Sequence, residues 1–186
     1  MLRFIPRQAR PLDGRAAAAL RPYEGVTARL LYARGITDAS QADAFLNPSL
    51  DRLHDPLRMH GMAEALDILT DARRKGLAVA VYGDYDVDGI CACALMTQAL
   101  RRFGLRADPH TPLREEGYGL NMAAVEQLAK DYRVLVTVDL GITNHEEVRL
   151  AQRLGMRVIV TDHHGLGLEA SPAGAALNPL LGDYPF

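Results

Sequence analysis

The sequence predicts an α/β fold: a doubly wound, mainly parallel sheet flanked by helices, with a helical N-terminal extension. Three short apolar runs rich in β-branched residues, at 77–83, 133–139 and 156–162, have the composition of strands buried on both faces. Predicted helices separate these runs, and strands that alternate with helices form parallel sheets with right-handed crossovers. The chain has 186 residues, 48% of them hydrophobic, which is enough for one such domain and a small appendage.

The extension is expected to occupy residues 1–55. Segment 25–36 has apolar residues at helical spacing and ends near a glycine, and a Thr-Asp pair then offers a cap for a second helix at 39–46. An Asn-Pro step stops that helix, and 48–60 has the composition of a linker. We therefore expect a domain boundary near residue 55 and an α/β domain over 56–186.

The elements of the α/β domain are expected to alternate. They are a helix at 62–76, a strand at 77–83, a helix at 90–104, a weaker strand at 106–112, a helix at 122–131, a strand at 133–139, a helix at 145–155, a strand at 156–162 and a short strand near 174–177. Glycines end the first two of these helices, as is common at helix C-termini. In open parallel sheets, ligands bind at the carboxyl ends of the strands.

Composition excludes several classes of protein. No apolar run approaches the roughly 18 residues of a membrane helix, and the N-terminus lacks the apolar stretch of a secretory signal, so we expect no membrane association and a cytoplasmic location. The net charge of −2 gives no support to a nucleic-acid partner, although a concentrated acidic site would itself lower that sum. Dinucleotide-binding and P-loop glycine motifs are absent from the sequence.

Acidic and imidazole groups follow each of the three strong strands. Asp84, Asp86 and Asp88 follow the first strand, and Asp139 follows the second. If the chain stays extended after the first strand, the three alternating carboxylates point the same way, about 7 Å apart. Two charges about 4 Å apart repel by about 4 kcal/mol at an effective dielectric near 20, so such a set favours a bound divalent cation.

A calcium-binding EF-hand is excluded, because position twelve from the first aspartate is Leu95 rather than a glutamate, and a strand precedes the motif. A solvated acidic turn remains an alternative, but it does not explain the residues at the other strand ends.

His163 and His164 follow Asp162 at the end of the third strong strand. Because adjacent side chains diverge in an extended chain, we expect one imidazole to bind metal and the other to face substrate. Carboxylates with imidazole suit Mn²⁺ or Mg²⁺, and shared carboxylates permit two ions about 3.5–4 Å apart.

Two further features concern phosphate. The helix near Gly89 directs its N-terminus at the same sheet edge, where its dipole favours anions. Arg114 is a candidate for holding a phosphate, or is simply a surface arginine. Tyr118, between two glycines, either stacks on a base or packs in the turn.

The strings VYGDYDVDGI, TVDLGI and TDHH, in this order, resemble the DHH phosphoesterases, and in detail the RecJ-like branch of single-strand-specific exonucleases. The resemblance runs from about residue 50 to residue 186. It implies that Asp86, Asp88, Asp139 and His163 bind Mn²⁺ or Mg²⁺. Asp84 matches the motif and is taken as a further candidate ligand.

The resemblance also implies that His164 and Arg114 contact the scissile phosphate as catalytic residues. The activity that it implies is 5′→3′ hydrolysis of single-stranded DNA, in DNA repair and recombination. Members of the family continue with another metal-binding aspartate and a second domain, so the resemblance implies a domain truncated at its C-terminus. Two alternatives remain: a phosphoesterase acting on short oligonucleotides, cyclic dinucleotides or pyrophosphate, and an inactive scaffold.

Overall fold

The computed structural model describes residues 11–23, 25–113, 115, 117 and 119–182. The chain divides into two compact units, Met1–His54 and Asp55–Phe186, and each is described by itself. Among the described residues, no helix combines the length and apolar character needed to cross a bilayer.

The N-terminal unit is helical. It contains α1 (Gly14–Ala19), α2 (Val26–Ala33), α3 (Ala39–Leu46) and a short 3-10 turn, η1 (Leu50–Arg52). Asp13 caps α1 through the main-chain nitrogen of Ala16, and the same carboxylate accepts a hydrogen bond from the Tyr32 hydroxyl at 2.8 Å. A small core of its own unites these helices: Ala16, Leu20, Ala28, Leu31, Tyr32 and Ala42.

The second unit alternates helices and strands. Its elements are η2 (Pro56–Arg58), α4 (Met62–Lys75), β1 (Ala78–Gly83), α5 (Val87–Arg102), β2 (Arg106–His110), α6 (Met122–Asp131), β3 (Val134–Val138), α7 (His145–Arg153), β4 (Arg157–Thr161) and β5 (Ala175–Leu177). Every residue of β1 and β3 is buried, as expected for wholly apolar strands in the centre of a parallel sheet.

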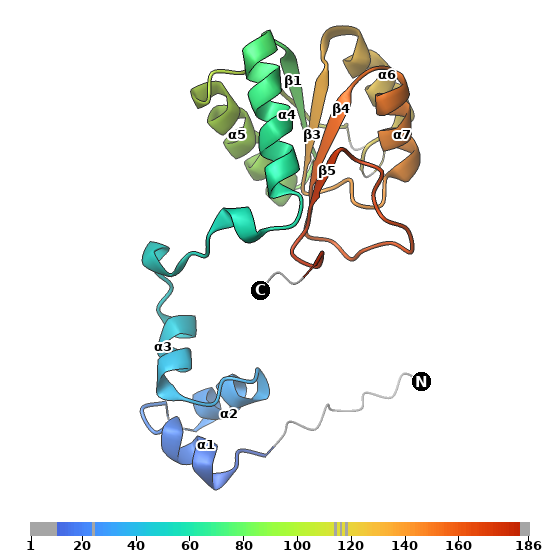
Figure 1. Ribbon diagram of the computed structural model, residues 1–186. Coiled ribbons are helices and arrows are strands. Elements are labelled where there is room, and N and C mark those ends of the chain that lie inside the picture. Colours follow the sequence, from blue (N-terminus) through green and yellow to red (C-terminus); the bar gives the residue numbers. More distant parts are fainter. Residues whose placement is uncertain (1–10, 24, 114, 116, 118, 183–186) are drawn as a thin grey trace, which may run out of the picture. The chain divides into compact units, whose positions relative to one another are not determined.

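The five strands form one parallel sheet in the order β2-β1-β3-β4-β5. Helices α4 and α5 cover one face and α6 and α7 the other (Figure 1), with an apolar core on each side. The predicted doubly wound α/β fold is therefore confirmed. From β1 the chain first moves outward to β2 and then returns to β3 on the opposite side, so the strand order reverses between β1 and β3, where such sheets bind ligands.

One helix begins earlier than the sequence predicted. Helix α5 starts at Val87 rather than at residue 90, because Asp86 acts as its N-cap and accepts a hydrogen bond from the main-chain nitrogen of Gly89 at 2.9 Å. This difference changes the geometry of the acidic segment after β1.

Candidate metal centre

The residues that follow β1, β3 and β4 lie at the same edge of the sheet, because parallel strands end together. The register pairs Gly83 with Val138, and Val138 with Thr161, so each strand reaches its last residue at the same level. Asp84, Asp139 and Asp162 are the next residues along each chain segment.

The turn from β1 into α5 does not stay extended, and the expectation of three carboxylates pointing one way is wrong. Asp84 is buried, Asp86 caps the helix, and Asp88 is exposed in its first turn. Gly89 allows this tight turn: a Cβ atom there would lie 2.5 Å from the main-chain nitrogen of Asp84. The chain forms the first turn of α5 here instead of an extended segment, because Asp86 caps the helix and Gly89 packs against the main chain of Asp84.

Asp84 is a buried carboxylate, with 1% of its surface exposed. Neither of its carboxylate oxygens has a hydrogen-bond partner among the described residues. A buried polar atom without a partner is costly and calls for an explanation such as a bound ion or water. The three residues Asp139, His163 and His164, described below, form a closer group to which Asp84 does not belong.

Asp139 has a strained main chain, with φ of 62° in the left-handed region. Its main-chain nitrogen donates to the carbonyl oxygen of Thr161 at 3.0 Å, which holds the residue against the end of β4. Among the described residues it is the only one other than glycine with positive φ. Such conformations cost about 1–3 kcal/mol and cluster at functional sites.

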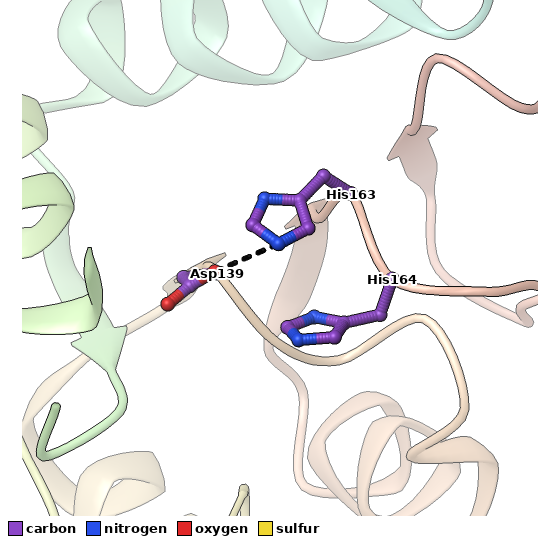
Figure 2. Close-up of side chains that lie close together, drawn as sticks. All are labelled: Asp139, His163 and His164. Atoms are coloured by element: carbon purple, nitrogen blue, oxygen red, sulfur yellow. Dashed lines mark ion pairs between the residues drawn. The ribbon is translucent and has the colours of Figure 1, made fainter. Parts of the chain in front are cut away.

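Asp139, His163 and His164 each offer a ligand atom, and these atoms lie within 4.8 Å of one another. Nε2 of His163 is 3.6 Å from Oδ1 of Asp139, the contact dashed in Figure 2. The two imidazole rings lie side by side, with centroids 4.5 Å apart and planes inclined by 32°. The expectation that the histidines diverge is wrong, because the chain has left the strand conformation at this point.

Charges gather around Asp139. Burial raises the pKa of the Asp139 carboxyl above its ordinary value, and the charges of Asp86 and Asp88 raise it further, whereas His163 and His164 lower it. Asp88, Asp139 and His163 also line one hollow of about 360 Å³. Asp86 and Asp88 are therefore near enough to Asp139 for their charges to act on its carboxyl group, although they do not belong to the close group of Asp139, His163 and His164.

Comparison with known proteins identifies the family of this chain. The model of the DHH family, N-terminal domain, matches residues 78–184, which include every residue of the close group. The chain belongs to the DHH family. The predicted resemblance is thereby confirmed.

Relatives of this DHH chain include RecJ proteins, described as single-stranded-DNA-specific exonucleases. RecJ of Bacillus subtilis is 35% identical over 165 residues, or 87% of this chain and 21% of the relative. RecJ of Thermus thermophilus is 40% identical over 126 residues, which are 67% of this chain and 19% of the relative. RecJ of Escherichia coli is 38% identical over 161 residues, which are 85% of this chain and 27% of the relative. The chain thus spans about a fifth to a quarter of the length of these relatives.

Solved structures agree with this assignment. An exonuclease RecJ bound to manganese has a TM-score of 0.64 and 38% identity, covering 69% of this chain and 34% of that one. RecJ of Thermus thermophilus in complex with Mn²⁺ has a TM-score of 0.67 and 33% identity, covering 90% of this chain and 23% of that one.

Within the DHH triplet, the role of Asp162 was not foreseen. It is buried, and its Oδ1 accepts hydrogen bonds from the main-chain nitrogens of His163 and His164 at 2.7 and 2.9 Å and lies 2.8 Å from Nδ1 of His164. Its Oδ2 accepts from Ile142 at 2.9 Å, which ties the loop after β3 to the loop after β4. The sequence signal that could have indicated this role is the position of Asp162 between a buried strand and two histidines.

The Asp162 contacts set opposite pKa shifts. The hydrogen bond from His164 to Asp162 raises the pKa of the imidazole above its ordinary value. Burial acts to raise the pKa of Asp162, but the hydrogen bonds from His164, Ile142 and His163 hold it below its ordinary value. The pair therefore favours a charged imidazolium beside a charged carboxylate.

Asn178 was also missed: it lies just past β5 and donates from Nδ2 to the carbonyl oxygen of His164 at 2.9 Å. The string ALNP, in which an Asn-Pro step follows a short strand and which supports the family resemblance, was the sequence signal for this residue. The predicted phosphate contact Arg114, and Tyr118, lie outside the described residues.

Proposed function

We propose that this chain carries the metal centre of a phosphodiesterase that uses Mn²⁺ or Mg²⁺, with two ions when fully loaded. Asp86, Asp88, Asp139 and His163 are the proposed ligands, and Asp84 is a further candidate. The observation that carries the proposal is the close approach of Asp139, His163 and His164 at the sheet edge where the strand order reverses.

The residues present fit such ions. Carboxylate oxygens with an imidazole are the donor set that Mn²⁺ and Mg²⁺ favour over thiolate-preferring metals. Asp84 has buried carboxylate oxygens without a hydrogen-bond partner among the described residues, and Asp86 and Asp88 crowd Asp139 with like charge. A cation would relieve both the missing partner and the repulsion.

When bound, divalent ions supply a water of lowered pKa as the nucleophile and neutralise charge on the phosphate. The protein's own residues hold and orient the groups around them. The hydrogen bond to Asp162 raises the pKa of His164, which favours an imidazole that donates a hydrogen bond to an anionic phosphate. The N-terminus of α5 adds a favourable dipole, and Arg114 is proposed as a second phosphate contact.

The proposed substrate is single-stranded DNA, digested from its 5′ end to release 5′-mononucleotides. The support is the identity of 35–40% to proteins described as single-stranded-DNA-specific exonucleases, over 67–87% of this chain. A role in DNA repair and recombination, and a cytoplasmic location, follow from such a substrate and belong to the same proposal.

Metal binding tests the centre. Calorimetric titration with Mn²⁺ should show binding by the chain, and Asp139→Asn and Asp86→Asn should each weaken it by about tenfold or more. Asp131→Asn, which removes the same charge from an exposed position at the end of α6, is the matched control and should bind as the unaltered chain does. Equal affinity in all four proteins rejects the proposed site.

A cleavage assay tests the substrate. With Mn²⁺ present, end-labelled single strands, matched duplexes and dinucleotides are compared under the same conditions. The assay uses a protein of the relatives' full length, because this chain spans about a fifth to a quarter of that length and the chain by itself is not required to cleave. We expect single strands to be degraded first. Faster cleavage of dinucleotides than of long single strands contradicts the proposed substrate, and Mn²⁺ binding by the full-length protein without any cleavage favours the inactive scaffold.

A further inference from the structure

We propose that Asn178 is a positioning residue for this centre, fixing the main chain at His164 and thereby the direction of the histidine pair. The inference rests on the proposed function, because it concerns how the same residues are held. Asn178 acts through a main-chain carbonyl oxygen, that of His164.

The loop that carries the histidines has little packing to define its shape. The side chains of His163 and His164 are 59% and 47% exposed, and residues 163–170 are all exposed. Gly165 follows directly, and glycine leaves the main chain free to rotate. The positions of the two imidazoles therefore depend on hydrogen bonds to the main chain rather than on burial.

Strand β5 brings Asn178 to this loop. Thr161 pairs with Leu177 in parallel register, and the main-chain nitrogen of Asp162 donates to the carbonyl oxygen of Leu177 at 3.0 Å. The next residue, Asn178, is 0% exposed and lies at the carboxyl edge of the sheet. A strand of only three residues thus carries a polar side chain to the candidate metal centre.

Both ends of the Asn178 amide are used. Nδ2 donates to the carbonyl oxygen of His164 at 2.9 Å, and Oδ1 accepts from the main-chain nitrogen of Leu180 at 2.9 Å. An aspartate would keep the acceptor but lose the donor. A serine could keep the local turn to Leu180, as serine side chains often do, but is too short to reach His164 in the same way.

Asn178 complements Asp162, which holds the other side of the same residue. The Asp162 carboxylate binds the main-chain nitrogen and Nδ1 of His164, and Asn178 binds its carbonyl oxygen. His164 is therefore fixed at three atoms. Removing one of these contacts frees the peptide group between His164 and Gly165 and loosens the segment that carries the proposed ligand His163. Loss of contacts that support a metal-binding residue typically weakens metal binding about 10–100-fold.

The test compares Asn178→Asp and Asn178→Ser with the unaltered chain by two measurements. Mn²⁺ affinity should fall about 10–100-fold in both variants. In Asn178→Asp the Mn²⁺ affinity should fall even though the added negative charge by itself favours a cation. Asn178→Ser removes the hydrogen-bond donor without adding charge. In metal-free protein, the amide hydrogen of His164 should exchange about tenfold faster in both variants.

Val79→Ala is the control for a general loss of stability. Val79 is fully buried at the opposite end of β1 from the metal centre, so this variant should be destabilised without changed Mn²⁺ affinity or changed relative exchange at His164. If Asn178→Asp does not fold, Asn178→Ser carries the test.

The outcomes separate this inference from the proposed function. Mn²⁺ affinities in both variants equal to that of the unaltered chain overturn the positioning role. If the unaltered chain binds no Mn²⁺, the proposed function fails, and amide exchange alone then decides: unchanged exchange at His164 overturns the role of Asn178, and faster exchange supports it.

Discussion

Replacing Asp162 by asparagine should destabilise the α/β unit by about 2–4 kcal/mol. The carboxylate receives main-chain hydrogen bonds from His163, His164 and Ile142, and a further one from the His164 ring. An asparagine has one acceptor oxygen, so in either orientation at least one buried N–H faces an NH₂ group. A lost hydrogen bond to a charged group costs about 1.5–3 kcal/mol, and the stranded donor adds to that cost.

Urea unfolding in EDTA measures this loss without any contribution from metal. The two compact units need not unfold together, so hydrogen exchange of peptides from β3 and β4 should be followed, because both strands belong to the α/β unit. With a denaturant slope of about 2 kcal/mol per molar urea, the midpoint should fall by roughly 1–2 M. Asp131→Asn, at an exposed position, should leave the midpoint almost unchanged. Equal midpoints for Asp162→Asn and Asp131→Asn would refute the bracing role of this carboxylate.

Three further predictions concern other parts of the α/β unit. Gly89→Ala should cost about 1–3 kcal/mol, measured by thermal melting, because the new Cβ atom would lie 2.5 Å from main-chain atoms after β1; an unchanged melting temperature argues against that close packing. Asp139→Gly should raise the melting temperature of the metal-free chain, since glycine tolerates φ of 62°, and should weaken Mn²⁺ binding; a lower melting temperature contradicts the inferred strain. Hydrogen bonds from Lys75 and Arg74 hold the pKa of Asp71 at about 2, below its ordinary value of 3.8. The stability that Asp71 contributes is therefore complete above about pH 4 and is lost as the pH falls toward 2, so the melting temperatures of Asp71→Asn and the unaltered chain should differ at neutral pH and converge in acid. A difference that does not change with pH would contradict this linkage.

The sheet could be predicted from sequence because its central strands are buried on both faces. Strands β1 and β3 appear in the sequence as uninterrupted apolar runs, and a parallel sheet brings the ends of such runs to one edge. The gathering of Asp139 and the two histidines follows from that rule alone. The strand order was not predictable in this way, because it depends on which helices pack on which face.

The local geometry of the site could not be predicted, because it is decided by competing main-chain conformations. Alternating aspartates suggested an extended segment after β1, but capping by Asp86 and close packing of Gly89 start the helix instead. The adjacent histidines lie together because Asp162 turns the chain out of the strand conformation. Each outcome depends on hydrogen bonds that periodicity does not encode.

Asn178 illustrates a different limit. It meets His164 fourteen residues away only because the short strand β5 pairs beside β4. A three-residue strand has too few residues for an alternation pattern to specify its register. A contact such as the one between Asn178 and His164 can be inferred only when the pairing of β5 with β4 is known.

Anomalous X-ray diffraction from crystals of the chain grown with Mn²⁺ tests the proposed metal centre most directly. We predict a manganese peak within bonding distance of the Asp139 carboxylate and the His163 imidazole, with Asp86 or Asp88 also coordinated. Crystals saturated with Mn²⁺ that show no peak between these side chains, or a peak only elsewhere on the molecule, would contradict it.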